Sequence, residues 1–467
     1  MRVAWQVGVL RALEEAGLTF AHADGTSGGT INLAMLLSGH SPLEMCERWR
    51  TLRIADFASP LPARDYLRAP HLTAFGGADG IVDKVFPHLG VDVERIRDAE
   101  GIVGTFNVCN HSTKTNESVE HRHLELELLV AGISLPVLMP AVRRSGSRYT
   151  DSVWIKDANL TGAVKRGAEE LWIVWCIGNT PEYRDGPFNQ YVHMIEQSAN
   201  GVLFEEFDRI RDLNDEIRGG RAQHGQRRPI VAHVIAPRYP LPLDPDFYLG
   251  RIDAGTLIAM GYRDARAYMA TMDAEQGTPL TPEATRMQQP ARGVSWRQVR
   301  HGHLAPITAK ASEAGDGSLT VELAAEVTDA EAFIAGPRRA GLLVGRLQGP
   351  LVGDALVREG TVTLEHGALV YDARFDRDGL GYRLTARQEV GTAGPPLRRL
   401  CALGALDVVL RDAHGAPLAE GRLGPARGRI ASPLPKLRAT NADSTWQRLA
   451  TAGRFARFLL RALLGRR

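Results

Sequence analysis

The sequence predicts an α/β domain, then an all-β domain, then an amphipathic helix near the C-terminus. Three observations carry this prediction. Apolar patterns in the first half alternate between helical and strand-like spacing, whereas residues 293–424 hold short alternating runs separated by turns. Arginines near the C-terminus recur along one helical stripe, with apolar residues opposite.

Length and composition set the frame for this division. A chain of 467 residues exceeds what one hydrophobic core usually supports. Residues 274–292 are rich in Pro, Gly and polar side chains, as a linker would be. We therefore predict an α/β domain over 1–273, a linker over 274–292, a β domain over 293–424, and a tail over 425–467.

The bulk charge and the cysteines narrow the class of protein. The 56 basic and 54 acidic residues are too nearly balanced for a dedicated nucleic-acid binder. Cys46, Cys109, Cys176 and Cys401 lie far apart without zinc-ligand spacing, so we expect reduced, buried thiols and neither a metal nor a cofactor. The sequence has no signal-peptide pattern and no apolar run of about 20 residues, which predicts a cytoplasmic protein with possible peripheral contact to a membrane.

The first half begins with a predicted helix over residues 3–16. Val7, Leu10 and Leu13 recur at helical spacing there, and Gly17 is a natural stop. A short apolar run, 18–23, predicts a strand, and a second helix follows over 30–37. The remaining predicted elements are strands over 102–109, 171–176 and 229–235 and a long helix over 190–217.

Between the first predicted strand and the second helix lies the sequence Gly25-Thr26-Ser27-Gly28-Gly29. A G-x-S-x-G turn between a strand and a helix forces its serine into a strained conformation, and the glycines allow close approach of the backbone. The helix then directs amide groups and the positive end of its dipole at the site, which makes Gly28 the expected oxyanion donor. A plain glycine loop is the alternative, because so short a pattern recurs by chance.

The position of this turn decides between hydrolase architectures. Only 26 residues precede Ser27, whereas an ordinary α/β-hydrolase places several strands before its nucleophile. The stretch from Trp5 to Gly17 resembles the first helix of the patatin-like phospholipases, and Ala131 to Pro140 resembles their small-residue and proline segment. The resemblance implies a three-layer α/β fold and a lipid acyl hydrolase with a Ser–Asp dyad.

The resemblance also selects the partner of Ser27. The family's catalytic aspartate stands sixteen residues before a Gly-Ala-Asp segment, and Asp151 stands sixteen before Gly167-Ala168-Glu169. Asp157 is the second choice. The family's Asp-Gly-Gly or Asp-Gly-Ala triplet is here Asp151-Ser152-Val153, which lacks the flexible glycine. As a base Asp151 must accept the serine proton, so we expect burial to raise its pKa.

One departure leaves alternatives open. The family's oxyanion loop is Gly-Gly-Gly-x-Arg, and Met1-Arg2 resembles its last two positions, so Arg2 is a further candidate oxyanion residue. We expect the first strand and the glycines to lie upstream of this start. The alternatives are a catalytically silent patatin-fold protein that binds lipid or a partner, and an acyltransferase that passes the acyl group to another acceptor. The expected substrate is phospholipid or neutral lipid.

Several other polar or aromatic residues have a less specific pattern. His121 and His123 are expected to be ordinary polar residues rather than a triad or metal site. Trp172 and Trp175 are expected in the core. The residues that either line a pocket or belong to a solvated loop are Asn107, Asn110, Lys114 and Glu120.

The C-terminal half offers two further hypotheses. In residues 454–467 three arginines face away from Phe455, Phe458, Leu459 and Leu463, which predicts either an interfacial membrane helix or a helix packed on the protein. The β domain is a sandwich or a barrel, and either binding of an apolar ligand or a packing role is open for it.

Overall fold

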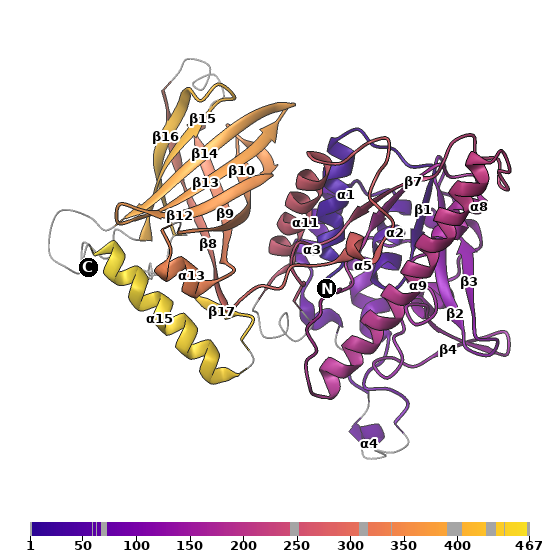
Figure 1. The fold of residues 1–467 in the computed structure, drawn as a ribbon. Coiled ribbons are helices and arrows are strands. Elements are labelled where there is room, and N and C mark those ends of the chain that lie inside the picture. The colour runs from indigo at the N-terminus through magenta and orange to yellow at the C-terminus, as the bar shows by residue number, and fades with distance from the viewer. Residues whose placement is uncertain are drawn as a thin grey trace. The chain divides into compact units, whose positions relative to one another are not determined.

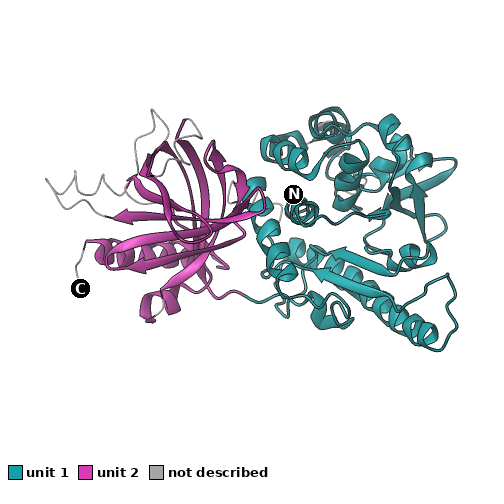
Figure 2. Cartoon of the chain, turned by 90° about the horizontal axis from the view of Figure 1, so that it is seen from above, with its two compact units in different colours: residues 1–289 teal, residues 290–467 magenta. Residues whose placement is uncertain are grey.

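The computed structural model describes residues 2–57, 59–61, 63–66, 72–242, 252–307, 316–337, 339–389, 404–425, 436–442 and 444–464. The chain divides into two compact units, residues 1–289 and 290–467 (Figure 2). Unit 1 mixes helices and strands, and unit 2 is an antiparallel β structure with a C-terminal helix (Figure 1). The predicted fold class is therefore confirmed.

Unit 1 contains long helices and short strands at nearly the predicted positions. Its helices are α1 (Ala4–Glu15), α2 (Gly28–Leu37), α3 (Pro42–Thr51), α4 (Ala63–Tyr66), α5 (Phe86–Leu89), α6 (Val93–Arg97), α7 (Leu126–Ala131), α8 (Leu160–Lys165), α9 (Pro187–Arg218) and α11 (Ala254–Met269). Short 3-10 turns cover Ile54–Phe57, His121–His123 and Pro282–Thr285, and a π-helical turn covers Ile81–Val85. Its strands are β1 (His22–Gly25), β2 (Val103–Asn110), β3 (Thr115–Glu120), β4 (Val142–Arg144), β5 (Ser147–Asp151), β6 (Glu170–Val174) and β7 (Val231–Ile235).

The strands of unit 1 form two sheets. In the first sheet β1 pairs in parallel with β2, and β2 also pairs antiparallel with β3 and β5. Strand β4 pairs antiparallel with β5 in the same sheet. The second sheet is the parallel pair β6–β7. Among the described residues, β1 and β6 each pair along one edge only.

The first strand begins later than the apolar run predicts. Residues 18–20 are not in a strand, because the amide of Leu18 donates to the carbonyl of Leu13 and still caps α1. Gly17, with a φ of 78°, makes this turn possible. The strand starts at His22, so residues 19–21 separate it from the capping residue Leu18.

Helices cover both faces of the β6–β7 sheet. On one face, Ile173 and Val234 pack in a buried cluster with Leu203 and Phe207 of α9. On the other face His233 hydrogen-bonds the hydroxyl of Tyr268 in α11 at 3.0 Å. This arrangement is the helix–sheet–helix layering that the sequence predicts.

Helix α1 is locked against α11 by two glycines. A Cβ on Gly8 would stand 1.9 Å from the Ile258 carbonyl oxygen, and one on Gly261 would stand 1.9 Å from that of Trp5. The backbones therefore approach directly, and the Trp5 indole donates to Asp264 at 3.0 Å. This contact holds the start of α1 in place beside the turn at Ser27.

The stretch expected as a linker partly contacts unit 1. The Thr278 amide donates to the Ala232 carbonyl at 2.7 Å, and the Met287 amide donates to the Asn179 carbonyl at 3.0 Å. Met287 is buried. The boundary between the two units falls between Gln289 and Pro290, near the end of the expected linker.

In its described residues, unit 2 is a closed antiparallel barrel with two extra strands and two helices. Its elements are β8 (Gly293–Pro306), β9 (Ser318–Val327), α13 (Ala330–Ala335), β10 (Ala340–Gly349), β11 (Gly353–Leu356), β12 (Glu359–Glu365), β13 (Ala368–Arg377), β14 (Leu380–Glu389), β15 (Leu406–Arg411), β16 (Pro417–Gly424), β17 (Arg438–Thr440) and α15 (Thr445–Leu463). Pairing runs β10–β12–β13–β14–β15–β16–β8–β9, and β9 returns to β10, which closes eight strands. The choice between sandwich and barrel is thereby settled in favour of the barrel.

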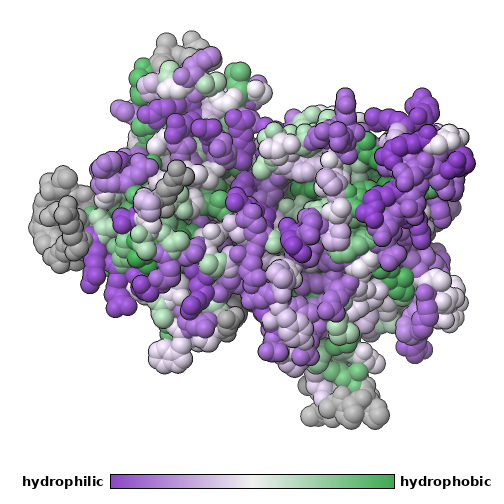
Figure 3. Space-filling view, in the orientation of Figure 1, coloured by the Kyte–Doolittle hydropathy of each residue, from purple (hydrophilic) through white to green (hydrophobic). Residues whose placement is uncertain are grey.

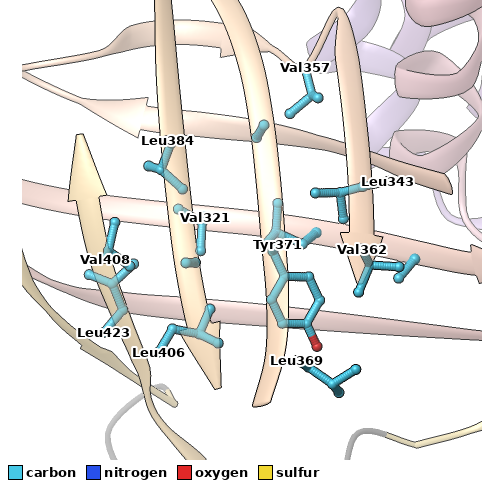
Figure 4. Close-up of a cluster of buried hydrophobic side chains, with 14 of the residues drawn as sticks. Val321, Leu343, Val357, Val362, Leu369, Tyr371, Leu384, Leu406, Val408 and Leu423 are labelled. Atoms are coloured by element: carbon cyan, nitrogen blue, oxygen red, sulfur yellow. The ribbon is translucent and has the colours of Figure 1, made fainter. Parts of the chain in front are cut away.

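Alternation along the strands fills the barrel with apolar side chains. In β13 the inward residues Leu369, Tyr371, Ala373 and Phe375 are fully buried. Figure 4 shows Tyr371 beside Val362 and Leu369 in this cluster, which includes side chains from every barrel strand.

Helix α15 packs its apolar face on the barrel core. Phe455, Leu459 and Leu463 are buried within the barrel cluster, and the Phe455 ring lies 5.3 Å from that of Phe333 in α13. Of the two hypotheses for this segment, packing on the protein accounts for these three residues. No helix in the described ranges is long and apolar enough to cross a bilayer.

Candidate active site

Ser27 occupies a strained turn between β1 and α2. Its φ of 53° and ψ of −126° lie where side chains with a Cβ are rare. The Gly29 amide donates to the Thr26 carbonyl at 2.8 Å, and the Thr30 amide donates to the Ser27 carbonyl at 3.0 Å. The turn is thus held on both sides of the serine, as a nucleophile elbow requires.

The glycines of this turn serve different purposes. A Cβ on Gly28 would stand 2.2 Å from a methyl carbon of Val3, and one on Gly25 would stand 3.0 Å from the Gly29 carbonyl. A Cβ on Gly29 would meet nothing within 4 Å. Close packing therefore requires glycine at 25 and 28, where the start of α1 and the elbow touch, but not at 29.

The amide of Gly28, the predicted oxyanion donor, stands at the N-terminus of α2. It is the first amide of α2, and the first amides of a helix have no acceptor within the helix. The positive end of the helix dipole adds to the attraction for negative charge. Arg2, the other candidate, has its guanidinium 4.0 Å from the Glu196 carboxylate in α9. Its charge partly offsets the rise that burial causes in the pKa of the Cys176 thiol.

Asp151 ends β5 close to Ser27. Its backbone is fixed by a hydrogen bond from its amide to the Ser134 carbonyl at 3.0 Å, and its Oδ1 accepts the Val153 amide at 2.9 Å. The residue is fully buried, and Oδ2 accepts no hydrogen bond of ordinary geometry from the described residues. Burial raises the pKa of Asp151 to about 7. The nearby Ser27 hydroxyl and the Val153 amide partly offset this rise.

Two further aspartates share this environment. Burial raises the pKa of Asp157 to about 8, and the charges of Asp151 and Asp24 raise it further. Burial of its carboxyl likewise raises the pKa of Asp24 to about 6. At neutral pH Asp157 therefore favours its protonated form more strongly than Asp151 does.

Asp24 is a residue that the sequence analysis missed. Although the residue as a whole keeps solvent exposure, its carboxyl accepts hydrogen bonds from Thr105, from Asn107 at 2.5 Å and from Asn159 at 3.4 Å. Ser118 extends this network by donating to the Asn107 amide oxygen at 2.6 Å. The available signal was an aspartate directly before the elbow glycine, in a strand where acidic residues are rare.

The other residues considered from sequence lie in varied places. Asn107 is buried beside Asp24, whereas Asn110 is buried at the end of β2, where it accepts the Ser112 amide. Lys114 is exposed in the following turn, and Glu120 pairs with Arg166 at 2.9 Å. Asn107 therefore belongs to the polar network of the site.

The histidines and tryptophans considered from sequence are not in this network. His121 is a buried residue whose ring nitrogens face the Gly104 amide and the Ala99 carbonyl, and His123 is exposed. Trp172 stacks on His233, and Trp175 is buried.

The described cysteines are free and buried, and Cys401 lies outside the described residues. In the described ranges no three His, Cys, Asp or Glu side chains are grouped to hold a metal ion.

Phe75, Val137 and Leu138 are exposed apolar residues that we call the apolar rim. Tyr191 links this rim to the surroundings of Asp151. The charge of Asp151 contributes, after burial, to raising the pKa of Tyr191 to about 12, and the Tyr191 hydroxyl donates to the Pro136 carbonyl at 2.7 Å. The next residue, Val137, has a φ of 75° and is 53% exposed. Its carbonyl accepts the amide of Phe75, which is 61% exposed.

One family of known proteins matches the part of the chain that holds this site. The model of the patatin-like phospholipase family matches residues 1–164, a range that contains Ser27, Asp151 and the whole polar network around them. Residues 1–164 form a patatin-like phospholipase domain. At the level of the family, this match supports a lipid hydrolase.

The other comparisons do not bear on the patatin-like assignment. No curated protein matches the sequence. Among solved structures, VipD from Legionella pneumophila matches with a TM-score of 0.31 and 11% identity, over 58% of this chain. The chain covers 65% of the length of that protein.

Proposed function

We propose that the patatin-like domain is a serine lipid acyl hydrolase in which Ser27 is the nucleophile and Asp151 is the base. The observation that carries this proposal is the pairing of a strained serine at a helix N-terminus with a buried carboxyl whose pKa is raised to about 7. A raised pKa suits a base that must take up a proton at neutral pH. Asp157, with a pKa of about 8, is mostly protonated there and serves as a neutral neighbour.

In the first half-reaction the Ser27 hydroxyl oxygen attacks the ester carbonyl carbon, and its proton passes to Asp151. The carbonyl oxygen becomes an oxyanion, which the Gly28 amide and the N-terminus of α2 stabilise. The bond from carbon to the alcohol oxygen then breaks, and the leaving alcohol takes the proton from Asp151. The product is an ester of Ser27.

In the second half-reaction a water molecule replaces the alcohol. Asp151 accepts a proton from the water as its oxygen attacks the acyl-enzyme, and it returns that proton to the Ser27 oxygen when the ester bond breaks. The acyl group leaves as a carboxylic acid. Transfer to an alcohol acceptor would follow the same steps with the acceptor in place of water.

The apolar rim suggests how lipid reaches the serine. Figure 3 shows hydrophobic side chains gathered beside the projecting segment that carries α4, and the exposed Tyr66 of α4 donates to the carbonyl of Phe75 at 2.8 Å. Exposed contiguous apolar surface in a protein is typical of interaction sites. We therefore place contact with aggregated lipid at Phe75, Val137 and Leu138, not at the apolar face of α15.

The test is hydrolysis of a p-nitrophenyl ester and of phospholipid vesicles by the full chain and by Ser27→Ala. The full chain should hydrolyse both, and the variant should lose activity on both. The value of kcat/KM should rise about tenfold per pH unit below pH 7 and level off above it, because the ionised form of Asp151 is the base.

Circular dichroism of each protein serves as the folding control. Activity that survives in folded Ser27→Ala would contradict the assignment of the nucleophile. No activity in a folded parent would instead favour a silent, lipid-binding form.

A further inference from the structure

Helix α15 carries apolar side chains on the side that does not pack on the barrel. It lies along the outside of the barrel (Figure 1), and its buried face is formed by Phe455, Leu459 and Leu463. Trp446 is nevertheless 82% exposed, and Leu449 is 63% exposed. Single exposed apolar residues are common on protein surfaces, but large ones that gather on one helix call for an explanation.

The exposed residues lie along one stripe of the helix. Starting from Trp446, apolar or small residues recur every three or four positions, which is the spacing of one helical face. Leu464, directly after the last helical residue, continues the stripe and is 38% exposed. None of the residues in this series is buried. We call this face the outer stripe, and its members are Trp446, Leu449, Gly453, Ala456, Leu460 and Leu464.

The charges on α15 have a single sign. Its residues Thr445–Leu463 include four arginines and no aspartate or glutamate. Arg457 and Arg461 are exposed, and each stands three positions before a leucine of the outer stripe, so both flank it. Among the described residues neither arginine forms an ion pair, whereas Arg454 pairs with Glu331 at 2.8 Å. The outer stripe is therefore bordered by positive charge that no described carboxylate balances.

This combination of features indicates an anionic lipid surface as the partner. Exposed Trp and Leu beside a face that is rich in arginine are typical of helices that lie in a membrane interface. Tryptophan prefers the level of the lipid head groups, and arginine is attracted to anionic lipids. A second copy of α15 is a poorer match, because two such helices would bring arginines together with no acidic residue on either helix.

We propose that the outer stripe docks α15 on an anionic lipid bilayer. Trp446, Leu449 and Leu460 enter the head-group region, and Arg457 and Arg461 contact the lipid phosphates. The helix lies along the membrane surface while its buried face stays packed on the barrel. This docking surface belongs to unit 2, and it depends neither on the proposed catalytic chemistry nor on the apolar rim of unit 1.

The test is cosedimentation of the full chain with vesicles of phosphatidylcholine alone and of equal parts phosphatidylcholine and phosphatidylglycerol. The chain should bind the anionic vesicles roughly 10- to 30-fold more tightly, because each arginine near an anionic surface contributes about fivefold. The double variant Arg457→Gln with Arg461→Gln should remove most of this preference. Leu449→Gln should weaken binding to the anionic vesicles by about tenfold, because less apolar surface leaves water. Ser27→Ala should bind as the parent does, which separates this proposal from that for the active site.

Matched controls change an exposed leucine and two exposed arginines elsewhere on unit 2. They are Leu380→Gln and the double variant Arg374→Gln with Arg383→Gln, and both should bind as the parent does. Circular dichroism checks that each variant is folded. Equal binding of the parent to both kinds of vesicle, or unchanged binding by folded Leu449→Gln, would overturn the proposal. A dimer of the parent that Leu449→Gln dissociates would also overturn it and would assign the outer stripe to a second copy of the chain.

Discussion

The two units handle buried polar groups in contrasting ways. In unit 1 three carboxyls gather near the ends of β1 and β5: burial raises the pKa values of Asp24, Asp151 and Asp157, and the charges of the first two raise that of Asp157 further. In unit 2 they lie in the middle of a closed sheet, among apolar side chains that alternate regularly. Open strand ends expose reactive groups to a substrate, whereas a closed barrel encloses them.

The contrast extends to the buried polar atoms that make no hydrogen bond. In both units most buried polar side-chain atoms are paired, and the exceptions among the described residues include Oδ2 of Asp151 in unit 1 and Nε of Arg300 in unit 2, which make no hydrogen bond of ordinary geometry. Such exceptions in a native structure call for an explanation. We explain the exception at Asp151 by its proposed role in accepting the proton of Ser27.

The largest effect should come from Asp151→Asn. Since the proposed base is removed while the volume is kept, kcat should fall by roughly 10³- to 10⁴-fold, the loss seen when a catalytic carboxylate becomes an amide. Hydrolysis of a p-nitrophenyl ester measures the change. The double variant with Ser27→Ala should be no less active than Ser27→Ala alone, because the two residues act as one unit. An additive loss would show that they act separately.

The barrel side of the comparison is tested by Phe455→Ala. Phe455 is fully buried against Trp296 and Phe333, so truncation should cost about 3–5 kcal/mol of stability in unit 2. Chemical denaturation followed by circular dichroism measures the loss. Trp446→Ala is the control on the same helix, since Trp446 is 82% exposed and should change stability little. Similar losses in both variants would contradict the packing of α15 on the barrel.

The elbow can be probed with two neighbouring glycines. Gly28→Ala forces a methyl group into Val3 and should cost roughly 1–3 kcal/mol, as overpacking does. Gly29→Ala has open space and should leave stability unchanged or slightly improved. Thermal unfolding of the two variants and the parent compares them. A larger loss at Gly29 would show that the close approach of α1 to the elbow is described wrongly.

A further effect concerns the dependence of stability on pH. Asp157 keeps its proton in the folded state up to a pKa of about 8, whereas the unfolded chain releases it near the ordinary value, so this group makes the fold less stable as pH rises from about 4 to 8. Asp157→Asn should therefore raise the unfolding temperature at pH 8–9 and leave it unchanged at pH 4. Asp215→Asn, at an exposed position, should show no such trend. A gain that is equal at both pH values would refute the burial of Asp157.

How much could be predicted from sequence follows from the same contrast. The turn at Ser27 could be located because Gly25-Thr26-Ser27-Gly28-Gly29 lies between a strand and a helix. The family resemblance selected Asp151 from its spacing to Gly167, and its role as the base stays a prediction. The start of β1 was misplaced because the apolar residue Leu18 caps α1. Alternation in residues 293–424 is the same for a sandwich and a barrel, so only the pairing of β9 with both β8 and β10 decides. The side-chain contacts of Asp24 and Arg300 depend on strands far apart in sequence.

The most direct test of the central claim is covalent labelling of the full chain with a fluorophosphonate, followed by peptide mass mapping. The account predicts one adduct on the peptide that contains Ser27, absent in Ser27→Ala and formed much more slowly in Asp151→Asn. An adduct on a different serine, or equal labelling of the parent and Asp151→Asn, would contradict the proposed pair.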